Sequence, residues 1–559
     1  MFNDNIERLV VSFKVIHITD EDTTSLGVPT TPFEAIDFDT AMQEDAPGWR
    51  KSIIEEYEGL LKHNAFTIRK GTVPMGRKLI PNRLVLRKKY NTLGEVIRLK
   101  SRLCIRGDKQ AAGIDYFQTF ASVMRFDTLR SLLAKAAAED LEIDHLDVEQ
   151  AFLNPTLKER IFMQLPPFFR ELFPHLVGDM DAFVELNKAL YGLKQAPREW
   201  YIMVKEFYSK LGLQCSTADP NVFIGRGIYL PIFVDDKLII GKRAAVDQIK
   251  IEIMAKWKCK DLGPADLFVG FQIERNRAER SIRIHQTFYI TKLLQRLKLE
   301  NVNPVKLPIP AGTVLQPDPE NLLEGDEITA YRQIVGSVLY LANCTRPDIS
   351  YAVGQLARFM SAPSTIHYKT AKQLLRYLKG TTNTGILYSN RHNTNPTAYN
   401  IYTDATWGTE DDRVSFQGMV VIRYGGATSW SAQRQKSTAL SSMEAEIISA
   451  SEGGKESVWL GKLANDLREQ DANQPYIPTL FCDNLGTVEL LHDTKFHRRA
   501  KHIEIRHLYM RNDLVETGKL KVRHIPGENQ PADILTKQLP IEAFNKHCRT
   551  IGLTTTSDA

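Results

Sequence analysis

Two adjacent aspartates, Asp235 and Asp236, interrupt an otherwise apolar stretch that runs from residue 228 to residue 241. The flanking residues are rich in β-branched and large apolar side chains, which predicts two β-strands joined by a tight turn. Two neighbouring carboxylates repel one another unless a positive group neutralises them. A divalent cation does this, and Mg²⁺ normally joins such carboxylates to substrate phosphates. The alternative is a solvated turn that happens to carry two acids, and the rest of the chain favours the metal site.

A third carboxylate, Asp147, lies at the end of an alternating strand that we predict over residues 143–148. It is too far along the chain from Asp235 and Asp236 for local pairing, but the spacing is compatible with neighbouring strands of one sheet. Three carboxylates on two Mg²⁺ ions would form a two-metal site for phosphoryl transfer. In such a site one ion lowers the pKa of a 3′-hydroxyl and the other holds the triphosphate of an incoming nucleotide.

A second set of acids lies in the C-terminal part of the chain. Its members are borne by a predicted strand, the start of a predicted helix, a second strand and a further helix start: Asp404, Glu446, Asp483 and Asp533. Glu444 competes with Glu446 because it lies two residues earlier at the same helix start. We prefer Glu446, which the apolar pair Ile447–Ile448 follows directly. As isolated residues, all of these acids would be ordinary surface charges.

Positive charge is concentrated in two segments. Residues 77–109 hold eleven Lys/Arg and two acids, a net charge of +9, and residues 495–523 hold nine Lys/Arg and three acids, a net charge of +6. The whole chain carries only +5. Each segment could be a solvated face, but two of them beside candidate metal sites indicate a polyanionic partner.

The elements that must position these residues can be predicted from hydrophobic periodicity and turn signals. We expect helices near 46–61, 128–141, 198–211 and 244–257, a basic β-hairpin over 83–106, strands at 266–274 and 281–284, a mostly helical region over 286–380, and strands alternating with helices from about residue 396. The chain has no apolar run long enough to span a membrane, and its N-terminus lacks the order of a secretory signal. Six scattered cysteines without a C-x-x-C pair are typical of reduced intracellular thiols and give no zinc site.

Several motifs occur in an order that resembles the copia-type retrotransposon reverse transcriptases. The motifs are Leu146-Asp-Val-Glu-Gln-Ala-Phe-Leu-Asn154, Leu190-Tyr-Gly-Leu-Lys-Gln-Ala-Pro197 and Phe233-Val-Asp-Asp236, together with residues 98–107, 113–120, 261–263 and 345–349. The resemblance runs from about Trp49 to Leu539. It implies an α+β multidomain fold, a right-hand polymerase of fingers, palm and thumb followed by an RNase H-like α/β domain. The implied domains are a poorly ordered lead-in at 1–40, fingers and palm at 41–285, a mostly helical thumb and connection at 286–395, an RNase H domain at 396–541 and a C-terminal tail at 542–559.

The resemblance also implies roles for single residues. Asp147, Asp235 and Asp236 would bind the metal ions of the palm, and Phe152 would be the bulky gate that rejects a ribose 2′-hydroxyl. Four further residues would contact the incoming nucleotide: Lys100, Arg102, Tyr191 and Gly192. Ordinary core packing is the alternative for Phe152 and Tyr191. Two positions depart from the family: Phe233, where Tyr is usual, and Lys237, where an apolar residue is usual.

The C-terminal acids resemble those of an RNase H domain of the same family. Asp404, Glu446, Asp483 and Asp533 would then bind two Mg²⁺ ions, with Mn²⁺ as a substitute, and direct water at the RNA strand. The catalytic-loop histidine of cellular RNase H enzymes has no clear counterpart, so we assign no role to His524. Three histidines among basic residues, His497, His502 and His507, are expected to lie on a solvated or nucleic-acid-facing helix rather than to bind metal.

The function that the resemblance implies is an RNA-directed DNA polymerase with RNase H activity. Its partners would be an RNA template, a DNA primer, the RNA–DNA hybrid, dNTPs and, in an intact element, an element-encoded capsid and integrase, with no membrane. We expect an intracellular location, in a cytoplasmic virus-like particle with a nuclear stage. We also expect the chain to be a processed or truncated part of an element. The alternative is therefore a catalytically inactive remnant that at most binds nucleic acid.

Overall fold

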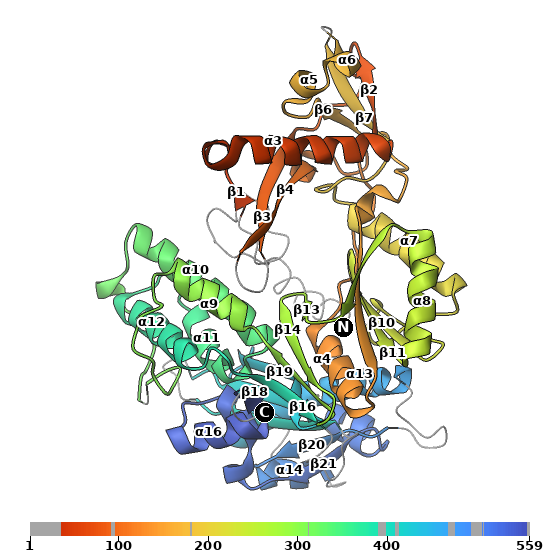
Figure 1. The fold of residues 1–559 in the computed structure, drawn as a ribbon. Coiled ribbons are helices and arrows are strands. Elements are labelled where there is room, and N and C mark those ends of the chain that lie inside the picture. The colour runs from red at the N-terminus through yellow and green to blue at the C-terminus, as the bar shows by residue number, and fades with distance from the viewer. Residues whose placement is uncertain are drawn as a thin grey trace.

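The computed structural model describes residues 35–90, 95–178, 181–310, 312–389, 399–408, 413–467, 476–492, 506 and 508–555. The expected lead-in at 1–40 therefore lies mostly outside the described residues, as do His497, His502 and His507. Five β-sheets and the helices between them make up the described part of the chain (Figure 1). This confirms the predicted α+β fold class.

The N-terminal part consists of a long helix and two small sheets. Helix α3 (Phe38–Lys62) contains the predicted helix 46–61, and the Asp37 side chain caps it by accepting from the Thr40 N–H at 2.9 Å. Strands β1 (Ala35–Ile36), β3 (Asn82–Tyr90) and β4 (Val96–Ile105) form one sheet, in which β3 and β4 are the predicted basic hairpin. Strands β2 (Phe66–Lys70), β6 (Phe162–Gln164) and β7 (Ala182–Leu186) form the other.

The six-stranded sheet carries the first set of aspartates. Its order is β12-β5-β11-β10-β9-β8, with bounds β5 Glu142–Val148, β8 Gln214–Cys215, β9 Val222–Gly225, β10 Ile228–Phe233, β11 Asp236–Gly241 and β12 Cys259–Pro264. One face packs on helix α4 (Phe126–Ala138) through residues such as Leu238 and Ile240. The other face packs on helices α7 (Ala196–Lys210) and α8 (Arg243–Lys256) through Ile232 and Ile239. The alternation of side chains along a strand thus sends neighbouring residues into two different cores.

A third region links the six-stranded sheet to the C-terminal part. It contains helices α9 (Thr287–Arg296), α10 (Asp326–Cys344), α11 (Ser350–Ala357) and α12 (Thr365–Gly380) beside a sheet of order β13-β14-β15-β16-β22. The strands of this sheet are β13 Leu267–Phe268, β14 Phe271–Asn276, β15 Ser281–His285, β16 Gly385–Ser389 and β22 Leu553–Thr554. The segment 542–559, which we expected as a tail, thus contains a helix, α16 (Ile541–Thr550), and a strand that pairs with β16.

The C-terminal sheet has the order β19-β18-β17-β20-β21. Its strands are β17 Asn400–Thr406, β18 Phe416–Arg423, β19 Gly426–Arg434, β20 Thr479–Cys482 and β21 Lys521–His524, and helix α13 (Ser442–Asp466) lies against them. The first three strands are antiparallel in sequence order, and β20 and β21 then run parallel to β17. This mixed sheet, with helix α13 against it, agrees with the α/β layer that we predicted for this part of the chain.

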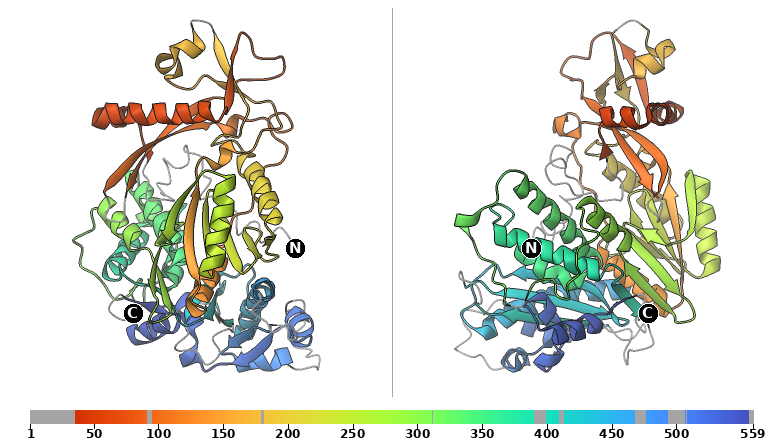
Figure 2. Two further views of the ribbon diagram at one scale, coloured as in Figure 1. Left: turned by 45° about the vertical axis from the view of Figure 1, so that its right-hand side comes forward. Right: turned by 60° about the vertical axis from the view of Figure 1, so that its left-hand side comes forward.

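The C-terminal part packs directly against the six-stranded sheet and the linking region (Figure 2). The buried Arg130 of α4 shows how closely. Its guanidinium donates to the carbonyl oxygens of Asn343 and Cys344 in α10 and of Thr428 in β19, each at 2.8 Å. It also lies 3.8 Å from the centroid of the Trp430 ring. One side chain therefore joins three regions of the molecule. No helix in the described part of the chain is long and apolar enough to cross a membrane.

Candidate active sites

The N-terminal carboxylate site consists of Asp147, Asp235 and Asp236. Strands β5 and β11 are antiparallel neighbours, and their register places Asp147 directly opposite Asp236. Asp235 lies in the turn between β10 and β11, where Phe233 pairs with Asp236. The predicted hairpin is confirmed, and so is the prediction that Asp147 ends a neighbouring strand of the same sheet.

The turn that carries Asp235 is held in a conformation that its sequence disfavours. Val234 has a φ of 58°, in the left-handed region where a β-branched residue is strained. The Trp200 indole N–H donates to the Val234 carbonyl oxygen at 2.8 Å and fixes the peptide from the α7 side. A side chain of another element, Trp200 of α7, therefore stabilises the strained turn.

The electrostatics of the N-terminal carboxylate site favour a bound cation. Burial raises the pKa of Asp235, the neighbouring Asp236 and Asp147 raise it further, and Arg102 opposes them. His145, two residues before Asp147 on β5, contacts Asp236 through Nε2 and Oδ1 at 3.1 Å. Asp147 and Asp236 thus make the charge of the half-buried Asp235 costly, although the groups of described residues with ligand atoms within 4.8 Å of one another do not include these three acids. A divalent ion with oxygen ligands would relieve the repulsion.

Three of the residues that we predicted to contact the nucleotide form one contiguous group. The Arg102 guanidinium lies 4.3 Å from the centroid of the Tyr191 ring, and the Tyr191 and Phe152 rings pack edge to face at 5.0 Å. Burial alone would lower the pKa of Arg102, but the nearby Tyr191 and Asp235 raise it overall. Arg102 Nε is buried and has no hydrogen-bond partner in the part of the chain that the structure describes. The planar, charged guanidinium near Asp235 is suited to bind a phosphate oxygen.

Gly192 and Lys100 lie on the rim of this group. Gly192 has a φ of +93°, and a Cβ there would lie 2.1 Å from the Ile105 carbonyl oxygen. The backbones at Ile105 and Gly192 approach so closely because the Ile105 N–H donates to the Tyr191 carbonyl oxygen at 2.9 Å. Lys100 pairs with Arg87 in the β3–β4 register, and its charge acts on the half-buried Glu56 together with that of Arg102. The structure thus gives Gly192 a close backbone approach and places Lys100 on the hairpin that carries Arg102.

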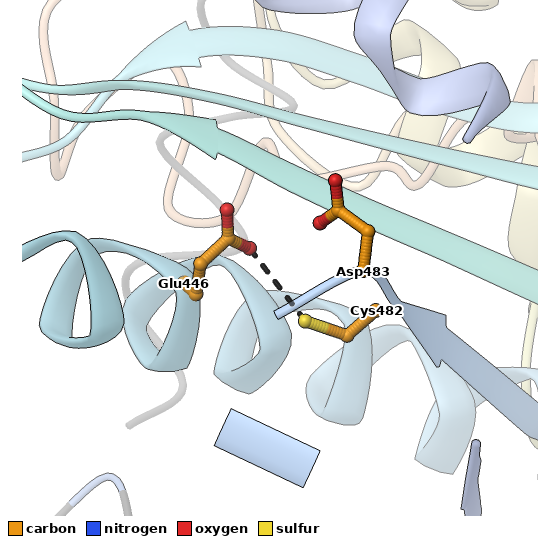
Figure 3. A group of neighbouring side chains, drawn as sticks. All are labelled: Glu446, Cys482 and Asp483. Atoms are coloured by element: carbon orange, nitrogen blue, oxygen red, sulfur yellow. Dashed lines mark hydrogen bonds between the residues drawn. The ribbon is translucent and has the colours of Figure 1, made fainter. Parts of the chain in front are cut away.

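The C-terminal carboxylate site consists of Asp404, Glu446, Asp483 and Asp533. Ligand atoms of Asp404, Asp483 and Asp533 lie within 4.8 Å of one another. The same holds for Glu446, Cys482 and Asp483, which Figure 3 shows side by side with the Cys482 thiol directed at the Glu446 carboxylate. Asp483 is common to both groups. The four acids that the sequence singled out are therefore gathered at one place, from strand β17, helix α13, the end of strand β20 and the turn of 3₁₀ helix at Pro531–Leu535.

Burial makes negative charge costly in this site. It raises the pKa of Glu446 well above its usual range, with further contributions from Asp404 and Asp483. Burial and the charge of Asp404 also raise the pKa of Asp533 to about 7, against the opposing effect of Lys537. Lys537 Nζ lies 2.9 Å from Asp533 Oδ1 and 3.6 Å from Asp404 Oδ2. One ammonium group for four carboxylates leaves the site with excess negative charge, as expected of a site that binds divalent ions.

The structure separates Glu444 from Glu446. The Glu444 side chain accepts from the Leu440 N–H at 2.6 Å, and its own N–H donates to the Ser441 side chain at 3.1 Å. Glu444 therefore closes the N-terminus of α13, like the acid of a capping box. Glu446 instead accepts from the Ala405 N–H at 3.2 Å, directly after Asp404. The geometry places Glu446, and not Glu444, in the C-terminal carboxylate site.

Several residues at these sites were missed at the level of sequence. They are His145 and Trp200 at the N-terminal carboxylate site and Cys482, Thr536 and Lys537 at the C-terminal one. Thr536 donates to Asp404 Oδ2, and Cys482 Sγ lies 3.7 Å from Glu446 Oε2. Four of them lie within four residues of a site acid in the sequence, so proximity was the available signal. Trp200 carried no such signal, because it reaches the turn from a helix. His524, to which we gave no role, contacts the main-chain oxygen of Asp483 at 3.1 Å.

Comparisons with known proteins agree with this geometry. A family model described as reverse transcriptase (RNA-dependent DNA polymerase) matches residues 64–311. The chain is 34% identical over 514 residues to the retrovirus-related Pol polyprotein from transposon TNT 1-94 of Nicotiana tabacum, an alignment that covers 90% of this chain and 38% of the polyprotein. It is 35% identical over 541 residues to the corresponding polyprotein from transposon RE1 of Arabidopsis thaliana, covering 95% of this chain and 35% of the polyprotein.

The chain thus spans little more than a third of the length of these plant polyproteins. A transposon Ty5-1 protein of Saccharomyces cerevisiae is shorter: it is 32% identical over 315 residues, which cover 55% of this chain and 98% of that protein. Among solved structures, a foamy viral protease–reverse transcriptase in complex with double-stranded DNA aligns over 88% of this chain and 70% of its own, with 10% identity and a TM-score of 0.46. The sequence relationships place the chain in a family: it belongs to the reverse transcriptase portion of the copia-type retrotransposon Pol polyproteins.

Proposed function

We propose that the chain is an RNA-directed DNA polymerase with RNase H activity, with one reaction at each carboxylate site. The observation that carries the polymerase assignment is the register of β5 and β11, which sets Asp147 against Asp236 with Asp235 in the adjoining turn. Family membership supports the same activity. The proposed substrates are an RNA template with an annealed DNA primer and dNTPs, and the hybrid formed is the substrate of the nuclease.

In the polymerase reaction, Asp147, Asp235 and Asp236 would hold two divalent ions, for which we propose Mg²⁺. When bound, these ions supply charge stabilisation for the attacking and leaving oxygens of the phosphoryl transfer. Arg102 would direct its guanidinium at the triphosphate, and its contact with Tyr191 keeps the guanidinium in place. Phe152, which packs against the same ring, would present its side to the sugar. Binding and orientation of the nucleotide are thus the tasks of this chain's own residues.

In the nuclease reaction, Asp404, Glu446, Asp483 and Asp533 would hold divalent ions beside the scissile phosphodiester of the RNA strand. The donor set consists of hard carboxylate oxygens, which suits Mg²⁺ with Mn²⁺ as a substitute. Lys537 contacts two of the acids and would offset their mutual repulsion before the ions bind. This assignment rests on the gathering of the four acids and on the fold of the C-terminal sheet.

The test uses two matched variants that each remove one carboxylate charge without changing side-chain size. Primer extension is measured on a poly-rA template with Mg²⁺, and cleavage is measured on a preformed RNA–DNA hybrid. Asp235→Asn should abolish extension and leave cleavage intact, whereas Asp404→Asn should do the reverse. Each variant is therefore the folding control of the other.

The alternative function is a nucleic-acid-binding remnant without catalysis. Wild-type chain that is folded, binds the hybrid and yet neither extends nor cleaves would support that alternative. Extension that persists in Asp235→Asn would contradict the assignment of the N-terminal carboxylate site. For the intact element, we further propose that an element-encoded capsid and integrase act with this chain, in a cytoplasmic particle with a later nuclear stage.

A further inference from the structure

Lys237 is a fully buried lysine directly beneath the N-terminal carboxylate site. It is the second residue of β11, where the register sets it opposite Leu146 on β5 and Ile232 on β10, and none of its surface is exposed to solvent. Because side chains alternate along a strand, Lys237 points to the face covered by α7 and α8, opposite to Asp236. An ammonium group in such a position needs a specific reason, since burial of an unpaired charge is costly.

The ammonium group contacts the backbone that carries the aspartates. Lys237 Nζ donates to the Asp235 carbonyl oxygen at 2.9 Å, and the same oxygen accepts from the Val148 N–H at 3.1 Å. One residue earlier, Trp200 holds the Val234 carbonyl oxygen from the same side. Lys237 Nζ also lies 5.4 Å from the centroid of the Trp200 ring. Two side chains therefore hold consecutive peptides of the turn from beneath.

The charge of Lys237 has no single carboxylate partner. In the described part of the chain it forms no ion pair within 4.0 Å, so its charge is not consumed by one neighbour. Asp235, Asp236 and Asp147 all interact electrostatically with this ammonium group. In a site of low dielectric, a unit positive charge this near lowers the repulsion among the three carboxylates and acts against any further cation.

We propose that Lys237 is a positioning residue and the resident counter-ion of the N-terminal carboxylate site: it fixes the main chain at Asp235 and supplies a positive charge against which divalent ions must bind. The inference rests on the proposed metal-dependent polymerase function and adds a determinant of its metal requirement. In a variant with an uncharged residue at position 237, divalent ions should occupy the N-terminal carboxylate site at a lower concentration.

Three substitutions separate the charge from the hydrogen bond. Lys237→Arg keeps the charge, Lys237→Gln keeps a donor without the charge, and Lys237→Met removes both while keeping an unbranched side chain one atom shorter. The Mg²⁺ concentration for half-maximal extension should fall about tenfold or more in the Gln and Met variants and stay near that of wild type in the Arg variant, since the removed charge acts on a doubly charged ion at short range.

A second readout does not depend on activity. Mn²⁺ binding to the free protein is measured by calorimetry, with and without Asp235→Asn to identify the heat that belongs to this site, and it should tighten in the Gln and Met variants. Two controls accompany it. The Mg²⁺ dependence of hybrid cleavage by the same chains should not move, and Lys135→Met, which removes a buried lysine that pairs with Glu139, should leave the Mg²⁺ dependence of extension unchanged.

The outcomes are distinct. Unchanged metal dependence in both neutral variants would overturn the proposal, as would a Gln variant that behaves like wild type while only Met differs, because the hydrogen bond alone would then be the contribution of Lys237. Failure of every chain, including wild type, to extend a primer would instead refute the proposed polymerase function. In that case the Mn²⁺ titration would still decide whether Lys237 opposes metal binding.

Discussion

Removal of the Asp466 carboxylate should loosen the C-terminal part of the chain from the six-stranded sheet. Asp466 is the last residue of α13, where the helix dipole disfavours a negative charge. Its carboxylate nevertheless accepts from the Ser216 hydroxyl at 2.6 Å and from the backbone N–H groups of Thr217 and Ala218 at 2.7 and 3.1 Å. The Thr217 hydroxyl donates to it as well, at 3.0 Å. An acid in an unfavourable helical position is thus bound by four donors of the segment between β8 and β9.

The magnitude follows from these contacts. A hydrogen bond to a charged group contributes about 1.5–3 kcal/mol to stability, and a buried donor left without a partner costs a similar amount. Four donors that share one carboxylate are not additive, and Thr217 is exposed. We therefore expect Asp466→Ala to weaken the contact by about 3 kcal/mol, which corresponds to a factor of about one hundred in the population of locally opened molecules.

Amide hydrogen exchange measures this opening directly. Exchange at Thr217 and Ala218 should accelerate about one hundredfold in Asp466→Ala, while amides in the centre of β11 should change little. Asp466→Asn should have a smaller effect, and Asp513→Ala, which removes an exposed acid elsewhere in the C-terminal part, should have none. Unchanged exchange at Thr217 and Ala218 would show that the carboxylate does not hold the two parts together.

Two further predictions concern the carboxylate sites. Phe152→Val, which opens space beside Tyr191, should raise incorporation of ribonucleotides relative to deoxyribonucleotides by roughly tenfold or more in single-nucleotide extension, and an unchanged ratio would remove Phe152 as the sugar gate. In the metal-free protein, the pKa of Asp533 is raised to about 7, so the folded state binds a proton that the unfolded chain releases near its ordinary value of 3.8. Stability should therefore fall as pH rises from about 4 to about 7. Thermal unfolding with a chelator across this range measures it, and Asp533→Asn should flatten the profile.

The sequence allowed prediction of the elements that carry the acids, because each has a local signature. The hairpin at Asp235 and Asp236 was visible as two apolar runs around a polar turn, and a helix start was predicted at Glu446. The choice between Glu444 and Glu446 was also made from the neighbouring apolar pair. Which of the two acids enters the site is decided by helical geometry, and that part of the prediction agrees with where the side chains lie.

What could not be predicted depends on contacts between distant segments. Nothing in the periodicity of α4 indicates that Arg130 reaches both α10 and β19, because a lone arginine in an Ala/Leu-rich helix looks like a solvated residue. The strand at Leu553–Thr554 was equally invisible, since two residues have no period. The hydrogen bond from Trp200 to the strained Val234 also could not be predicted, because it joins two segments that are distant in the sequence. Such contacts are specified by the packed fold and leave no pattern in the neighbouring sequence.

The two carboxylate sites meet the same electrostatic problem with a lysine each, but the lysines differ in their freedom to move. The Lys537 side chain is 38% exposed and contacts Asp404 and Asp533 directly, so it can turn toward solvent when a divalent ion takes its place. Lys237 is enclosed beneath the sheet and bound to the Asp235 carbonyl oxygen, so its charge stays when the ion arrives. The ammonium group of Lys537 can leave the site when the metal ion binds. The ammonium group of Lys237 cannot leave, so its positive charge remains beside that of the bound ion. The polymerase reaction should therefore require a higher Mg²⁺ concentration than the nuclease reaction of the same chain, and substitution of Lys237 by an uncharged residue should bring the two requirements together.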